Sequence, residues 1–468
     1  ASKLAWVLKN EPQIYEKAYK FLLPGDFIAY KLSGEISTTV NGLSEGIFWD
    51  FKEDKTADWL LDYYGIDNDL VPNLVDNFSN QCYISSEGSK QTGLKKGIPI
   101  KYRAGDQPNN AMALNILNTG EVAATGGTSG VLYALTESLE SNESLRLNNF
   151  AHVNYTNKNK LIGKLLCING AGIQYKWIKN ITNAKNYSQM NLLASKVNIG
   201  SDGLLLYPFG NGSERMFNNN EIGSCFKNLN LNLHSNSHLY RATLEGIAFS
   251  FMYAMEILTL DNFSPSLVRA GNDNLFQSDL FSQTISTLID KEIEIFDSTG
   301  AYGAARAVGC EPNDFKSYSE KITKNDYVKS FEPQKQKGLY LDAYKSWKQN
   351  LEKIINKDIM AIIGNREFFK GINEIKFEGK DSKNPLAFKY YNPEQIVAGK
   401  SMKDHFKFAV AYWHSFCGQG ADPFGAGTQN FPWDKSNDPF QAAKDKADAA
   451  FEFISKMGFE YFCFHDFD

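Results

Sequence analysis

Residues 121–309 alternate short apolar strands, glycine-containing turns and helices, and this alternation limits the fold more than any other feature of the chain. EVAATGGTSGVLYAL (121–135) predicts a strand, a glycine turn and a second strand. LVRAGNDNLFQSDLFSQTISTLIDKEIEIFDSTGAYGAARAVG (267–309) predicts strand, turn and helix twice in succession. Strands that alternate with helices pack as α/β layers. The sequence therefore predicts an α/β fold here.

The flanking segments carry helix signals and a change of composition. LLPGDFIAYKLSGE (22–35) predicts a helix entered after Pro24, with Asp26 able to cap it and Gly34 ending it. LYLDAYKSWKQNLEKII (339–355) has helical apolar spacing. The chain then becomes rich in aromatic residues, which predicts a domain boundary near Met360.

Composition excludes several classes of protein. Hydrophobic residues make up 43% of the 468 residues, charged residues make up 22%, and the net charge is -5. A chain without a basic excess is not expected to bind nucleic acid. The apolar stretch 244–260 contains Glu245 and Glu256, so a buried helix is expected rather than a membrane span. With no signal peptide and no CxxC pair, we expect a cytoplasmic protein with reduced thiols.

The glycine turn ATGGTSG (124–130) is the strongest local signal for a ligand site. Adjacent glycines allow backbone N–H groups to converge on a phosphate, and Thr128 and Ser129 add hydroxyl groups. The Lys of a P-loop is missing. A tight hairpin turn explains the same residues, so this stretch alone leaves both interpretations open.

Asp106 is the second candidate. It could be only the N-cap of the helix that follows, with Pro108 in its first turn. It could also be a carboxylate in a cleft that accepts a proton from a substrate hydroxyl during phosphoryl transfer. AGNDN (270–274) and STGAYGAAR (298–306) lie at strand-to-helix turns, where α/β sheets bind nucleotides.

In this order, the motifs of residues 1–357 resemble the FGGY carbohydrate kinases, most closely the xylulokinases. The matching stretches are SKLAWV (2–7), LLPGDFIAYKLSGE, AGDQPNNA, GGTSG, LLLYPFGNGSERMFNN (204–219) and GSCFKNLNLNLHSNSHLYRATLEG (223–246). The resemblance implies two actin-like, ribonuclease-H-like lobes, at 1–103 on the sugar side and 104–357 on the ATP side. The family's Asp-x-Gly-Thr strand is not in this sequence, so we expect the first lobe to be incomplete.

The resemblance also implies roles for individual residues. Asp106 would be the catalytic base and would contact the sugar. The residues implied to bind ATP are Gly126, Gly127, Thr128, Ser129, Gly271, Asn274, Gly300 and Gly303. The adenine-side turn departs from the family's three glycines, because Ala270-Gly271-Asn272 stands there. ATP and Mg²⁺ are the implied cofactors.

Residues 373–468, after a junction at 358–372, resemble the start of xylose isomerase. FKYYNPEQIVAGKSMKDH (388–405), WHSFCGQGADPFG (413–425) and EYFCFHDFD (460–468) carry the resemblance. It implies the opening portion of a (β/α)₈ barrel. His465 and Asp468 would be catalytic, and Trp413 and Phe424 would contact substrate. The alternation of Phe459, Tyr461 and Cys463 predicts a buried strand before His465.

These resemblances together predict an ATP-dependent kinase that converts D-xylulose to D-xylulose 5-phosphate, because the isomerase would supply the kinase's substrate. We expect weak or no activity from this chain, which we interpret as parts of two neighbouring genes joined by read-through or frameshift. Two alternatives are a xylose isomerase and an inactive nucleotide-binding fragment. The expected partners are a small sugar and ATP, and a homodimer is one assembly that the sequence allows.

Overall fold

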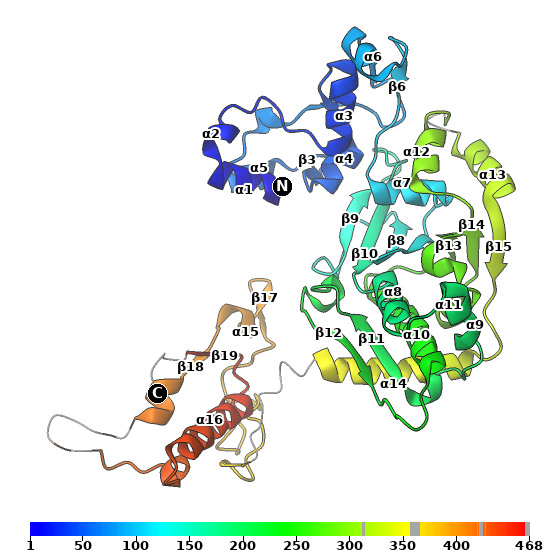
Figure 1. Ribbon diagram of the computed structural model, residues 1–468. Helices are drawn as coiled ribbons and strands as arrows, with labels where there is room; N and C mark the ends of the chain where they lie inside the picture. The colour runs from blue at the N-terminus through cyan, green and yellow to red at the C-terminus, as the bar shows by residue number, and fades with distance from the viewer. Residues whose placement is uncertain (311–313, 356–365, 419, 421–424, 426, 464–468) are drawn as a thin grey trace. The chain divides into compact units, whose positions relative to one another are not determined.

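The computed structural model describes residues 1–468 except 311–313, 356–365, 419, 421–424, 426 and 464–468 (Figure 1). The chain divides into two compact units, Ala1–Leu351 and Glu352–Asp468. Each unit has its own cluster of buried apolar side chains, and each is described separately below.

A seven-stranded sheet forms the centre of the first unit, with the strand order β15-β14-β13-β7-β8-β10-β9. The strands are β7 (Glu121–Gly126), β8 (Gly130–Thr136), β9 (Asn148–Ala151), β10 (Ile162–Ile168), β13 (Leu267–Gly271), β14 (Ile293–Phe296) and β15 (Tyr327–Phe331). β13 runs parallel to β7 and β14, and the other neighbours are antiparallel. The predicted order of strand, turn and helix is confirmed.

Among the described residues, α7 (Asp106–Ala113) precedes the first strand of the sheet, and the other α-helices of the second half of this unit follow that strand. They are α8 (Gly172–Ile181), α9 (Tyr187–Ala194), α10 (Asn236–Leu260), α11 (Asp279–Ile289), α12 (Gly300–Ala307), α13 (Phe315–Asp326) and α14 (Lys337–Ile355). A two-stranded sheet of β11 (Leu205–Phe209) and β12 (Gly223–Lys227) lies among them.

Successive side chains of β8 point to opposite faces of the sheet, and both sets are buried. Helices therefore cover both faces. Tyr133 shares one core with Met112 of α7 and Tyr318 of α13. On the other face, a Cβ at Gly130 would lie 2.7 Å from Cζ of Phe251 in α10. α10 is long and apolar enough to span a membrane by composition, but 72% of its most apolar window is buried in this unit. The predicted buried helix is thus confirmed.

Residues 1–103 form short elements around a smaller core. The helices are α1 (Ser2–Asn10), α2 (Pro12–Tyr15), α3 (Pro24–Ser33), α4 (Val40–Glu45), α5 (Asp58–Tyr64) and α6 (Ser86–Thr92). The strands are β1 (Ser37–Thr38), β2 (Trp49–Asp50), β3 (Lys55–Thr56), β4 (Asn73–Leu74), β5 (Cys82–Tyr83) and β6 (Pro99–Ile100). α3 begins at Pro24 with Leu23 as its N-cap, and the Leu23 N–H donates to the Asp26 carboxylate at 3.4 Å. Gly34 follows the helix in the left-handed conformation (φ 82°), as predicted.

The second unit is built on α16 (Pro439–Lys456) and several short elements. These are β16 (Ile396–Val397), β17 (Lys400–Ser401), α15 (Met402–His405), β18 (Ala409–Ala411) and β19 (Tyr461–Cys463). β18 and β19 pair in parallel, and the described residues of this unit form no barrel. The prediction of a buried strand after Phe459 is wrong: Tyr461 and Phe462 are each 44% exposed, although the Phe462 ring contacts that of Phe451 in α16.

Candidate functional site

Asp106 is the first residue of α7, and its side chain is exposed. The helix is capped by Gly105, whose extended backbone (φ -69°, ψ 175°) precedes the first turn, so the prediction that Asp106 is the N-cap is wrong by one residue. The carboxylate of Asp106 instead accepts a hydrogen bond from the Gln107 N–H at 2.8 Å. The Asp106 carboxylate is therefore held at one oxygen by the Gln107 N–H and is exposed to solvent.

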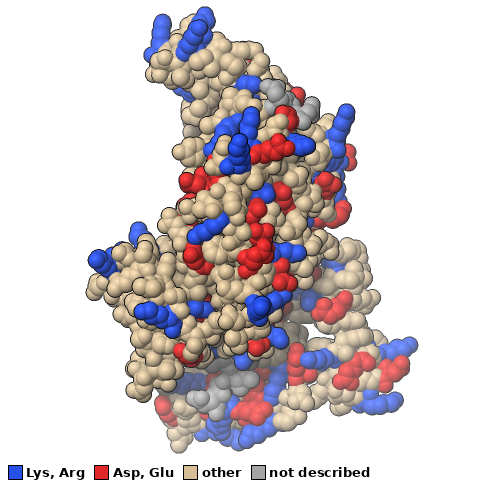
Figure 2. Space-filling model, turned by 90° about the vertical axis from the view of Figure 1, so that its right-hand side faces the viewer, with Lys and Arg blue, Asp and Glu red and all other residues tan. Residues whose placement is uncertain are grey.

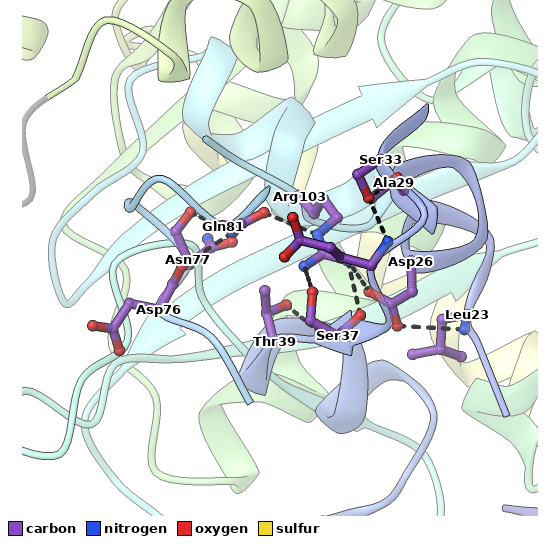
Figure 3. A network of polar contacts seen from close by, with 12 residues as sticks. Leu23, Asp26, Ala29, Ser33, Ser37, Thr39, Asp76, Asn77, Gln81 and Arg103 are labelled. Carbon is purple, nitrogen blue, oxygen red and sulfur yellow. Dashed lines mark hydrogen bonds and ion pairs between the residues drawn. The ribbon is translucent and has the colours of Figure 1, made fainter. Parts of the chain in front are cut away.

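A buried polar network centred on Arg103 holds the backbone three residues before Asp106 (Figure 3). Arg103 donates to Asp26 at 2.9 Å, to Gln81 at 2.9 Å and to both the carbonyl and the hydroxyl of Ser37, each at 2.9 Å. Burial raises the pKa of Asp26, and hydrogen bonding by Thr38 and the charge of Arg103 oppose that rise. The network joins α3, β1 and the segment before β5 to the residues leading into α7.

The turn between β7 and β8 closes against the start of α8. The Gly172 N–H donates to the Gly127 carbonyl at 2.9 Å, and the Ile173 N–H donates to the Thr128 carbonyl at 3.2 Å. A Cβ at Gly172 would lie 2.3 Å from that Gly127 oxygen, so only glycine allows this approach of two backbones. The turn and the helix start are thereby held as one structure.

A pocket of about 700 Å³ opens beside this turn. It is lined by Gly126, Gly127, Thr128, Gly172, Ile173, Tyr175, Lys176, Tyr187, Ser188, Asn191, Asp273, Asn274, Leu275, Gln277 and Ser278. Its size and its mixture of apolar and polar groups suit a small-molecule ligand of nucleotide size.

The structure brings some of the predicted nucleotide residues together and leaves others apart. Gly126, Gly127, Thr128 and Asn274 line the pocket, but Ser129, Gly271, Gly300 and Gly303 do not. Gly300 begins α12, and a Cβ there would lie 3.6 Å from the Asn110 nitrogen of α7. A Cβ at Gly303 would lie 2.6 Å from the Asn109 carbonyl and 2.8 Å from Cβ of Ala113, so close packing of α12 on α7 explains this glycine.

Sequence reasoning missed the wall of the pocket that α8 and α9 supply. Tyr175, Lys176, Tyr187 and Asn191 line it. The Tyr175 hydroxyl donates to Asn191 at 2.8 Å, and the rings of Tyr175 and Tyr187 stack at 5.7 Å. These residues belong to no motif in the sequence, and only the packing of α8 on α9 brings them together.

Asp106 lies near the strand end that carries the glycine turn, although it does not line the pocket. Burial raises the pKa of the Cys167 thiol, and the nearby charges of Glu214 and Asp106 add to this rise. Cys167 in β10 is paired with Val131, which directly follows the turn in β8. The Asp106 carboxylate is therefore close enough to act electrostatically on the strand end next to the turn.

Two more acidic side chains lie nearby: Glu45 close to Asp106, and Glu214 close to Cys167. Burial and then the charge of Asp106 raise the pKa of Glu45 to about 7, and the Gly105 backbone N–H acts in the opposite direction. Burial raises the pKa of Glu214 to about 7 although Asn169 N–H at 2.9 Å and Gly170 N–H at 3.1 Å donate to it. Sequence reasoning noticed Glu214 in its loop and gave Glu45 no role.

In the second unit, Trp413 begins a short π-helix (Trp413–Cys417), and its side chain is 47% exposed. Its ring contacts that of His414 edge-on at 5.0 Å. The other predicted isomerase residues, Phe424, His465 and Asp468, lie outside the described residues.

The sheet flanked by helices, the glycine turn and the exposed aspartate define an α/β protein with a nucleotide-sized pocket. Models of the FGGY family of carbohydrate kinases match the chain twice, the N-terminal domain at residues 1–113 and the C-terminal domain at residues 122–309. The two matches together cover more than half of the 468 residues. The chain therefore belongs, over residues 1–309, to the FGGY family of carbohydrate kinases.

Solved structures agree with this fold. The xylulose kinase from Rhodospirillum rubrum is 22% identical, with a TM-score of 0.67 over 75% of this chain and 71% of that chain. The Plasmodium falciparum glycerol kinase, solved with ADP, is 20% identical, with a TM-score of 0.68 over the same shares. Gluconate kinase from Lactobacillus acidophilus gives a TM-score of 0.64 at 18% identity. The α/β sugar-kinase fold over most of the chain is thus confirmed.

The C-terminal part of the chain is similar to a different enzyme. Xylose isomerase of Bacteroides thetaiotaomicron is 61% identical over 103 residues, which are 22% of this chain and 24% of that protein. Xylose isomerase 1 of Xanthomonas campestris pv. campestris is 61% identical over 108 residues. The chain spans about a quarter of the length of these curated relatives.

Proposed function

We propose that the chain transfers the γ-phosphoryl group of ATP to a ketose, with D-xylulose as the sugar, D-xylulose 5-phosphate as the product and the cytoplasm as its location. The observation that carries the proposal is that Asp106 is exposed at the start of α7, near the strand end at which the glycine turn borders a pocket. We infer that 1–103 and 104–357 are the sugar-side and ATP-side lobes of an actin-like kinase.

In this proposal Asp106 takes the proton from the attacking sugar hydroxyl as the oxygen–phosphorus bond forms. An exposed carboxylate with one oxygen held by the Gln107 N–H can receive that proton. The 126–129 turn and the first turn of α8 would hold the phosphates through backbone N–H groups. Gly271, Asn274, Gly300 and Gly303 keep their proposed ATP-side roles, with Gly303 acting through the packing of α12 on α7.

ATP brings Mg²⁺ to such sites. Among the described residues, no group of three or more His, Cys, Asp or Glu side chains could hold a metal ion by itself. This fits Mg²⁺, which usually keeps several waters and is bound through one or two carboxylates and the phosphate oxygens. When bound, the ion neutralises charge on the phosphates.

The choice of sugar is supported by both parts of the chain. Three solved structures of xylulose or xyloylose kinases each match 75% of this chain. Xylose isomerases, which the C-terminal part resembles, form xylulose from xylose. Two consecutive steps on the same sugar favour xylulose over glycerol or gluconate as the acceptor.

The test is formation of a phosphorylated sugar by the full chain. We expect mass spectrometry to detect xylulose 5-phosphate with ATP and D-xylulose, even at slow turnover, and to detect no product with Asp106→Asn. Calorimetry should show that Asp106→Asn still binds a non-hydrolysable ATP analogue as tightly as the wild type. Phosphorylation of glycerol or gluconate in preference to xylulose would contradict the choice of sugar.

Two other functions are separated by the same experiment. Binding of ATP without transfer to any sugar would favour a nucleotide-binding module without kinase activity. The 61% identity to xylose isomerase over 103 residues favours, for the second unit, a part in aldose–ketose isomerisation in which Trp413, Phe424, His465 and Asp468 would act. Metal-dependent conversion of xylose to xylulose by the chain would support that function.

A further inference from the structure

Glu45 is held beside the start of α7 by a helix that is fixed to the central sheet. It is the last residue of α4, whose buried Asn41 donates to the carbonyls of Ala151 and His152, both at 2.8 Å. The Ala151 N–H in turn donates to the Ser44 hydroxyl at 2.9 Å. Three hydrogen bonds to the end of β9 thus set the position of the residue next in the chain, Glu45.

The Glu45 carboxylate occupies the space that a side chain at position 105 would need. A Cβ on Gly105 would lie 1.8 Å from Oε1 of Glu45 and 2.0 Å from its Oε2. Gly105 is the N-cap of α7, and Asp106 follows it directly. The absence of a side chain at Gly105 is therefore what allows a second carboxylate to lie against the backbone that carries Asp106.

The surroundings of Glu45 compensate for its charge only in part, through the Gly105 backbone N–H. Among the described residues its Oε1 is buried without a hydrogen-bond partner. The titratable groups that face it are Asp106, Tyr102 and Tyr133, and none of them is a cation. A buried acceptor without a partner destabilises a fold, because its hydration is lost and not replaced.

A strained residue marks the same turn. Ile47, two residues after Glu45, has φ 58°, a left-handed conformation that is a genuine outlier for a β-branched side chain. Such strain is found preferentially at functional sites. The unpartnered buried oxygen of Glu45 and the strained backbone of Ile47 thus lie in one turn, beside the proposed base.

We propose that Glu45 is a positioning residue for Asp106: its carboxylate, seated on Gly105, repels the Asp106 carboxylate and keeps it turned outward for the sugar hydroxyl. The inference rests on the proposed kinase function. Two like charges at close range favour the arrangement that separates them. The Gln107 N–H holds one Asp106 oxygen, and the Glu45 carboxylate lies against Gly105, the residue directly before Asp106.

The first test does not need activity. Hydrogen exchange of the Gln107 amide, which reports its bond to Asp106, should be faster in Glu45→Gln and in Gly105→Ala, because a Cβ at 105 displaces the carboxylate without removing it. The matched control is Glu256→Gln, a carboxylate on α10 that pairs with Lys348 at 2.7 Å and does not line the pocket. Its Gln107 amide should exchange as in the wild type.

The same samples test the electrostatic contact. In ¹³C NMR of labelled glutamate, the Glu45 carboxyl should titrate near pH 7 in the wild type and at lower pH in Asp106→Asn, because that variant removes the charge of Asp106. Equal Glu45 titration in the wild type and Asp106→Asn, or wild-type Gln107 exchange in Glu45→Gln, would overturn the inference.

The kinetic test follows the rate of transfer. Glu45→Gln and Gly105→Ala should each lower kcat about 10- to 100-fold with the KM for ATP unchanged, as expected for a displaced catalytic group. The double variant should lose no more than either single variant, because both act through one contact. A wild type that binds ATP but transfers to no sugar would refute the proposed function, while the exchange and titration results would still decide whether Glu45 controls Asp106.

Discussion

The guanidinium of Arg103 lies 2.9 Å from the carboxylate of Asp26, and the two side chains are 8% and 4% exposed. This ion pair is buried at the centre of the network that leads to Asp106 (Figure 3). Because Arg103 also donates to Gln81 and to Ser37, its charge has hydrogen-bond partners on several sides. The pair therefore belongs to the class whose disruption leaves an uncompensated charge in the protein interior.

Arg103→Ala is expected to lower the free energy of unfolding by about 3–5 kcal/mol, because it leaves Asp26 buried without its cation. Urea denaturation measures this change. The control is Lys52→Ala, which breaks an exposed pair with Glu140 at 3.6 Å, where we expect less than ~1 kcal/mol. Equal losses in the two variants would show that burial of the Arg103 pair has no energetic consequence.

Gly172→Ala is expected to weaken binding of an ATP analogue at least tenfold. The new Cβ would lie 2.3 Å from the Gly127 carbonyl oxygen, so the turn that borders the pocket must move. Overpacking of this kind also lowers stability by about 1–3 kcal/mol. Calorimetric titration and urea denaturation measure the two effects.

Gly338→Ala is the matched control for this variant. Nothing lies within 4 Å of a Cβ at Gly338, which is in α14. Alanine is the better helix former, so stability should rise slightly and affinity for the analogue should stay the same. Unchanged affinity in Gly172→Ala would indicate that the nucleotide does not bind at the 126–129 turn.

Much of the first unit could be predicted because its signals are local. Gly126 and Gly130 bound a hairpin turn that the sequence predicted, and Gly34 ends α3 where a left-handed residue was expected. Local patterns do not define partners from distant segments. The contact between Glu45 and Gly105 and the tyrosines of α8 and α9 depend on packing, and no spacing in the sequence indicates them.

The error at β19 has a similar cause. The alternation of Tyr461 and Cys463 correctly indicated a strand, but burial depends on whether another layer covers it, and the strand's own residues carry no information about that layer. Surface charge is equally a property of the whole fold. On the face shown in Figure 2, Lys and Arg side chains are mixed with Asp and Glu, and neither sign forms an unbroken strip.

Acid should destabilise the protein partly through His152. This side chain is fully buried, and burial lowers its pKa from 6.5 to about 3. Between these values the unfolded chain binds a proton at His152 and the folded chain does not, so the stabilisation is complete above pH 6.5 and is lost as the pH falls. The slope from this group is about 1.4 kcal/mol per pH unit at most.

His152→Phe should therefore flatten the dependence of unfolding free energy on pH between 6.5 and 4. The control is Tyr133→Phe, which removes the same contact, Tyr133 hydroxyl to Nδ1 of His152 at 3.3 Å, but keeps the imidazole. Both variants should lose about 1 kcal/mol at pH 8, and only Tyr133→Phe should keep the wild-type slope. Urea denaturation at several pH values would contradict this if the slopes of the two variants are equal.

In the second unit, Glu452 joins α16 to the segment that precedes the small sheets. Its carboxylate is 1% exposed and accepts hydrogen bonds from the Phe368 N–H at 2.6 Å, the Phe369 N–H at 3.0 Å and Lys456 at 2.7 Å. Glu452→Ala removes all three, so we expect faster hydrogen exchange at the amides of Phe368 and Phe369 in the full chain.

Glu378→Ala, which removes an exposed carboxylate of the same unit, should leave those amides unchanged. Exchange at residues 121–136 reports the first unit and should be the same in both variants, because the two units have separate cores. Wild-type exchange at Phe368 in Glu452→Ala would mean that ring packing of Phe368 on Trp433, rather than the carboxylate, holds this segment on α16.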